Sequence, residues 1–138
     1  MPEIWLLNRQ RARTIDLSAL SRFAQRALEK IEVVGRTALP AEIIAVLVSD
    51  RRISQIHLRF MQVAGPTDVI TFQHGEILIS VETAHRQATQ FGTALLDELC
   101  LYLLHGLLHL AGYDDVTDSG SREMDRLQQE LMRAIRQG

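Results

Sequence analysis

The sequence predicts an α+β fold, in which a small mixed sheet of about four strands packs with about five helices. Three observations lead to this class. Several long segments carry apolar residues at helical spacing, and a β-branched run at 42–49 is typical of a buried strand. Two short apolar runs, 68–72 and 76–81, are joined by Gln-His-Gly, which favours an antiparallel hairpin. A chain of 138 residues suits one domain, and we expect a single domain over 1–138.

The first elements alternate strand and helix. The segment EIWLL at 3–7 predicts a short strand, and Asp16 is a suitable N-cap for a helix. Apolar residues recur at helical spacing until about Val34, and Gly35 ends this helix. The run at 42–49 is almost continuously apolar, so we expect a strand that is buried on both faces.

A second, shorter helix follows this strand. Asp50 can cap its first turn, and the segment AGPT at 64–67 breaks it. The residues expected to face inward from this helix are Ile53, Ile56 and Phe60.

The second half of the chain is mostly helical. Periodic apolar residues predict helices over 82–91 and 93–111, with Gly92 separating them, and a last helix over 121–136. The helix at 93–111 is apolar on most of its surface, so we expect it to be the central buried helix. The last helix has one apolar side, formed by Met124, Leu127, Leu131 and Ile135.

Composition limits the function classes. The chain is 46% hydrophobic and 23% charged, with a net charge of -2, which is typical of a globular protein and lacks the basic excess of a dedicated nucleic-acid binder. No apolar run approaches the ~20 residues of a membrane span, and no signal peptide is expected. The chain has one cysteine, Cys100, so no internal disulfide is possible, and we expect a cytoplasmic protein. Cys100 lies in an apolar run and is interpreted as a core residue.

The segment HGLLHLAGYDD carries the main chemical signal. His105 and His109 are four residues apart and share one helix face, which is a typical half-site for a divalent metal. Gly112 permits the left-handed turn that ends the helix and returns the chain toward the histidines. Asp115, ten residues after His105, stands where zinc sites of the form H-x-x-x-H-x-x-G-x-x-H have their third ligand. Asp114 is expected to support the turn or a ligand.

Two alternatives limit this interpretation. Both histidines could be ordinary core residues, although their combination with a glycine and an acid at these offsets favours a metal. A zinc protease has a glutamate after its first histidine, whereas this chain has Gly106, so peptide cleavage is disfavoured. Glu98 starts ~10 Å from His105 along the helix, too far for a base, and is interpreted as a favourable charge near the helix N-terminus.

The same segment resembles the signature H-G-x-L-H-L-x-G-Y-D-H of the bacterial YbeY family. The segments PTDVITF at 66–72, GEILIS at 75–80 and DEL at 97–99 are similar to further motifs of that family. The resemblance implies an α+β fold and one metal ion, usually zinc (Zn2+), held between three histidines. It also implies a single-strand-specific endoribonuclease of rRNA maturation and ribosome quality control, with the small ribosomal subunit and its RNA as partners.

This chain departs from the family pattern at two functional positions. Asp115 replaces the third histidine, so the ligand set becomes His105, His109 and Asp115, which adds a negative charge and favours harder ions. Met61 stands in place of a family arginine and is interpreted as a core residue; Arg59, two residues away, is a candidate substitute. His57 replaces a frequent asparagine and is expected to be exposed.

These departures leave three functions open. The first is the metal-dependent endoribonuclease, whose catalytic group would be a water on the metal with help from Arg59. The second is a metallohydrolase with another substrate, and the third is a metal-stabilised, ribosome-associated binding protein with weak or no catalysis. His74 and His85 are expected to be surface residues.

Overall fold

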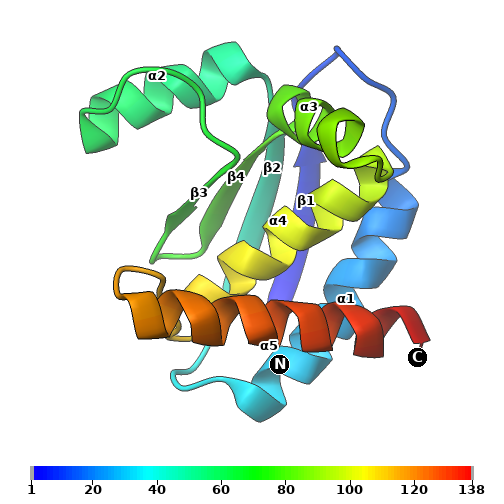
Figure 1. Ribbon diagram of the computed structural model, residues 1–138, viewed down its shortest axis with the longest axis vertical. Coiled ribbons are helices and arrows are strands. Elements are labelled where there is room, and N and C mark those ends of the chain that lie inside the picture. Colours follow the sequence, from blue (N-terminus) through cyan, green and yellow to red (C-terminus); the bar gives the residue numbers. More distant parts are fainter. Residues whose placement is uncertain (1, 138) are drawn as a thin grey trace.

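The protein, described here by a computed structural model over residues 2–137, has four strands and five helices in that range (Figure 1). The first half of the chain alternates strands and helices, and the second half is helical after the β3–β4 hairpin. In chain order the elements are β1 (Glu3–Asn8), α1 (Leu17–Val34), β2 (Glu42–Val48), α2 (Asp50–Met61), β3 (Val69–Phe72), β4 (Glu76–Ser80), α3 (Val81–Phe91), α4 (Leu95–Leu110) and α5 (Asp118–Gln137).

The strands form one mixed sheet in the order β1-β2-β4-β3, which confirms the predicted α+β class. β2 pairs in parallel with both β1 and β4, because helical connections return the chain to the same end of the sheet. β3 and β4 pair antiparallel through the predicted hairpin, with Thr71 opposite Ile77. β3 therefore lies at one edge of the sheet.

One face of the sheet carries the main core. Alternate strand residues such as Ile43, Leu47, Ile77 and Ile79 are fully buried on this face, against α1 and α4. Figure 1 shows α4 crossing the sheet between α1 and α5, at the centre of the fold. The expectation of a central buried helix is confirmed, since most apolar residues of α4 are buried.

The expectation that the strand at 42–49 is buried on both faces is wrong. Its burial alternates, and Glu42 and Ile44 are exposed on the side opposite the main core. On that side α2 covers only part of the sheet, through a small cluster that joins Val48, Ile53 and Leu78. The apolar content of β2 therefore reflects the β propensity of branched side chains as well as burial.

The start of α2 also differs from the prediction. Ser49, and not Asp50, is the N-cap, since its hydroxyl accepts a hydrogen bond from the Arg52 amide. The Asp50 carboxylate instead accepts hydrogen bonds from Arg86 and from two hydroxyl groups of α3 and its cap. Burial opposes ionisation, but the hydrogen bonds from Arg86, Ser80 and Thr83 outweigh it and hold the pKa of Asp50 below its usual value.

The end of α2 corrects two further expectations. Phe60, expected to face inward, is 54% exposed, and Met61, interpreted as a core residue, is 42% exposed. Ile53 is fully buried as predicted. α2 is a peripheral helix on a small second cluster, so only its first turns have a core to pack against.

The helix ends differ from the predicted ranges by a few residues. α4 begins at Leu95 rather than at 93, and α5 begins at Asp118 rather than at 121. Gly35 ends α1 as expected but is extended, whereas Gly92 ends α3 in the left-handed conformation. Within residues 2–137 no single helix has the length and apolar content to cross a membrane; α3 and α4 reach them only when joined across a 118° bend.

Candidate metal centre

The end of α4 turns the chain back toward its own last turns. Gly112 has φ +99°, and its amide donates to the His109 carbonyl while the Tyr113 amide donates to the Leu108 carbonyl. This is the Schellman pattern, which needs a residue with left-handed backbone after the helix. The Tyr113 hydroxyl then donates to the Val34 carbonyl at 2.6 Å, which fixes the turn to the end of α1.

The middle of α4 lies very close to the sheet. A Cβ atom added to Gly106 would stand 2.9 Å from Ile77 Cγ2 and 3.1 Å from Thr71 Oγ1. Only glycine allows this approach without a shift of the helix or the strands. Gly106, which rules out the protease pattern, therefore has a packing role here, and it brings the neighbouring His105 next to the edge strand β3.

The two histidines and Asp115 converge. The Nε2 atoms of His105 and His109 are 3.0 Å apart, and the two Asp115 carboxylate oxygens lie 3.6 and 3.7 Å from them. Within the described part of the chain this is the group of three His, Cys, Asp or Glu side chains that meets in one place. Both imidazoles are largely buried, whereas the Asp115 side chain is 47% exposed, so the group opens to solvent on its carboxylate side.

The outer nitrogen of each imidazole faces an oxygen. His105 Nδ1 lies 2.5 Å from Gln128 Oε1 on α5, and His109 Nδ1 lies 3.1 Å from the Tyr113 carbonyl oxygen. Each ring therefore carries its hydrogen on Nδ1, and both Nε2 lone pairs point into the space between the rings. Burial, and next to it the neighbouring His105, lower the pKa of His109, which favours the neutral form that binds metals.

The arrangement fits a divalent cation. Two nitrogen lone pairs and a carboxylate that face one another repel unless a positive charge lies between them. At metal–ligand distances of about 2.0–2.2 Å, the donor atoms of a tetrahedral ion are about 3.3–3.6 Å apart. The two imidazole nitrogens are 3.0 Å apart, and each lies 3.6 or 3.7 Å from a different oxygen of Asp115. With one donor atom taken from each residue, all three atoms lie within 4.8 Å of one another, which is close to the spacing that one ion needs.

The acids near the ligands have supporting roles. The Asp114 carboxylate accepts from the Val116 amide at 3.2 Å, as expected for a turn residue. Glu98 lies in the first turns of α4, as predicted, but is buried and accepts from the Thr93 hydroxyl at 3.0 Å. Neither carboxylate belongs to the converging group.

Arg59, the candidate substitute for the family arginine, does not line a groove with the candidate ligands. Arg59 lines a groove with Phe60 and Phe72, and none of the three candidate ligands lines that groove. His57 Nδ1 lies 3.0 Å from the Gly65 carbonyl and supports the loop after α2. His74 is on the surface of the hairpin, as expected, and stacks on Phe72, while His85 is only partly exposed on α3.

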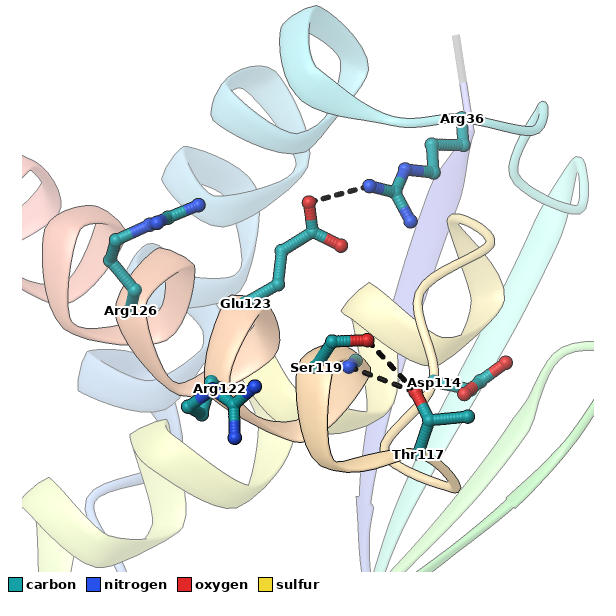
Figure 2. A pocket seen from close by; sticks show the side chains of 8 residues that line it. Arg36, Asp114, Thr117, Ser119, Arg122, Glu123 and Arg126 are labelled. Carbon is teal, nitrogen blue, oxygen red and sulfur yellow. Dashed lines mark hydrogen bonds and ion pairs between the residues drawn. The ribbon is translucent and has the colours of Figure 1, made fainter.

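A polar hollow of about 570 Å³ lies beside the turn that carries Asp114 and Asp115 (Figure 2). Arg36 pairs with Glu123 at 2.6 Å and stacks on the Tyr113 ring, with its Cζ atom 4.4 Å from the ring centroid. Arg122 and Arg126 also line the hollow. Three arginines and two acids, Asp114 and Glu123, thus leave a net positive lining close to the candidate metal centre.

Sequence reasoning missed Gln128. It is 8% exposed and lies on the apolar side of α5 between Met124 and Leu131. A glutamine at a buried position of an otherwise apolar helix side was a usable signal, because buried amides need hydrogen-bond partners. Its partner, His105, could not be identified from spacing, since 23 residues separate the two.

Comparisons with known proteins identify the family of the chain. A family model described as Endoribonuclease YbeY matches residues 6–136. The chain is similar to Endoribonuclease YbeY of Syntrophotalea carbinolica, with 35% identity over 152 aligned positions that cover 99% of this chain and 98% of that protein. It is also similar to Endoribonuclease YbeY of Moorella thermoacetica, with 33% identity and 86% of each chain covered. The solution structure of a Thermotoga maritima protein, 28% identical, matches with a TM-score of 0.68 and covers 96% of this chain and 89% of that one.

Proposed function

This chain belongs to the YbeY family of endoribonucleases, and on that premise we propose that it is a metal-dependent, single-strand-specific endoribonuclease. We further propose that it acts in the cytoplasm, in the maturation of small-subunit rRNA and in ribosome quality control. The observation that carries the metal dependence is the convergence of two imidazole nitrogens and one carboxylate within 3.0–3.7 Å.

His105, His109 and Asp115 would hold one ion, for which zinc is the first candidate and another divalent metal the alternative. When bound, the ion supplies Lewis-acid chemistry for phosphodiester hydrolysis. The chain itself orients the ligands: Gln128 and the Tyr113 carbonyl accept the Nδ1 hydrogens of the two rings and fix their tautomers. Asp115 closes the group on its solvent side, where a substrate strand can approach.

Charge around the site makes the ion necessary for this approach. Asp114, Asp115 and Asp118 follow one another closely on the turn and repel a phosphate backbone. The arginine-lined hollow beside Asp114 provides the opposite charge, and Arg36, Arg122 and Arg126 are suited to phosphate oxygens. These three arginines offer positive groups in a chain that has Met61 in place of the family arginine.

The test is RNA cleavage with and without metal. We expect cleavage of single-stranded RNA by the protein as purified, loss after chelation, and recovery when zinc is returned. His109→Ala should lose both bound metal and cleavage, whereas His85→Ala, which changes a histidine outside the group, should keep both. Full cleavage after complete metal removal would contradict the proposal.

Asp115 and Met61 favour a second candidate, a metal-stabilised protein that binds the ribosome with weak or no catalysis. The carboxylate reduces the Lewis acidity of a bound ion, and Met61 is an exposed side chain without charge. Co-sedimentation with the small subunit, measured beside RNA cleavage, separates the two: binding without turnover supports the second candidate. Absence of both RNA cleavage and co-sedimentation would instead favour a metallohydrolase with another substrate.

A further inference from the structure

The sheet face opposite the main core contains an open groove of about 680 Å³ between the sheet and α2. Its floor includes Val46 and Leu78, which alternate with core residues and so point away from α4. The part of the sheet that α2 leaves uncovered continues past the groove to Trp5 and Ile44, and both side chains are exposed. The groove is thus an apolar surface that the described chain does not cover.

Rings and arginines line this groove in alternation. Phe72 stacks on His74 with ring centroids 5.7 Å apart, and Phe60 meets Phe72 edge to face at 5.5 Å. The Arg59 guanidinium lies over the Phe60 ring at 5.4 Å, and Arg9 and Arg52 also line the groove. Within residues 2–137 no carboxylate pairs with these three arginines. The one acid in the lining, Glu76, lies 3.9 Å from His74.

We propose that this groove binds a single strand of RNA, with bases against Phe60, Phe72 and His74 and phosphates against Arg9, Arg52 and Arg59. Aromatic faces next to unpaired arginines are the combination that single-strand binding proteins use, since every base can stack and every phosphate carries charge. The three arginines make an apolar protein segment a poor occupant, because its binding would bury guanidinium groups that have no carboxylate partner. The inference rests on the proposed function, and it assigns a second contact to the same substrate.

The groove is connected to the metal centre around the edge strand β3. Phe72 faces the groove, and the preceding residue, Thr71, faces α4, because neighbouring strand residues point to opposite sides. Thr71 approaches Gly106, which is next to His105 in α4. A strand held in the groove therefore needs only to pass the edge of β3 to reach the candidate ligands, and we infer that the groove holds RNA beyond the cleaved bond.

The test measures binding separately from cleavage. The probe is a fluorescent single strand of about 12 nucleotides with 2′-O-methyl ribose, within the usual site size of about 4–16 nucleotides, and its intactness is checked on a gel. The triple variant Arg9→Gln/Arg52→Gln/Arg59→Gln should bind at least about tenfold more weakly, and its salt dependence should fall by about 2 in slope, or about 0.7 for each phosphate contact. Phe72→Leu should bind at least about fivefold more weakly through lost stacking.

Arg51→Gln is the matched control, because Arg51 is exposed on the same helix and does not line the groove. It should retain nearly the wild-type affinity and slope. Wild-type affinity of the triple variant, or an equal loss in Arg51→Gln, would overturn the inference. The inference would also be overturned if the wild-type protein were a dimer and the triple variant a monomer in solution, since a second copy would then cover the groove. Because the readout is binding, a protein without nuclease activity can still pass the test, so its failure is distinct from failure of the proposed function.

Discussion

Replacing Gln128 by leucine should weaken metal binding without unfolding the protein. The Gln128 oxygen lies 2.5 Å from His105 Nδ1, and the residue is 8% exposed, so no bulk water can replace it easily. Without this acceptor the His105 ring can move its hydrogen to Nε2, which removes the lone pair that would bind the ion. Leucine is close in size and continues the apolar side of α5, so packing is retained.

The expected magnitude follows from the number of ligands affected. Loss of an outer hydrogen bond to a metal-binding histidine typically lowers metal affinity by about 10–100-fold, which is about 1.4–2.7 kcal/mol. Only one ligand of three is affected, since His109 keeps the Tyr113 backbone carbonyl, which no side-chain substitution removes. The protein should therefore still bind zinc, but more weakly.

Competition with a chromophoric chelator measures the zinc Kd of each variant. Gln128→Glu keeps an acceptor at this place and should bind zinc at least as tightly as the wild type. Gln129→Leu changes the next residue, which is exposed, and should leave the Kd unchanged. The reasoning is refuted if Gln128→Leu binds zinc as the wild type does while the metal-free proteins unfold alike.

Three further substitutions test the packing and the hydrogen bonds of the fold. Gly106→Ala should lower the free energy of unfolding by about 1–3 kcal/mol, because the added methyl group meets Ile77 at 2.9 Å; an unchanged melting temperature would contradict the close approach. The pKa of Asp50 is depressed in the folded state, so its carboxylate stabilises the protein above its unfolded pKa of about 3.9, and this contribution is lost as the pH falls through the folded value. Asp50→Asn should thus cost about 2 kcal/mol at neutral pH and make urea unfolding less sensitive to acid below about pH 4, whereas a parallel pH profile would argue against it. Tyr102→Phe removes a buried hydroxyl that has no hydrogen-bond partner within residues 2–137, so thermal unfolding should show equal or slightly higher stability, and a clear loss would reveal a partner.

The fold class and the group of His105, His109 and Asp115 were accessible from sequence because both depend on local spacing. Apolar periodicity predicted about five helices and four strands, and the order of these elements indicated a mixed sheet. Two residues four apart, such as His105 and His109, lie on the same face of any α-helix. Gly112 then adopts the left-handed conformation that ends the helix. The turn is short, so the return of Asp115 toward the histidines was also determined locally.

Relations between distant segments were decided only by the tertiary structure. The open side of β2 and the exposure of Phe60 depend on how much of the sheet α2 covers, which no local pattern reports. Gln128 reaches His105 because α5 packs across α4. Asp50 accepts a hydrogen bond from Ser80, the N-cap of α3, because α2 and α3 begin at the same end of the sheet. Periodicity shows which side of a helix or strand is apolar. Which element packs against that side depends on the whole chain, because the core must be close-packed and every buried polar group must find a hydrogen-bond partner.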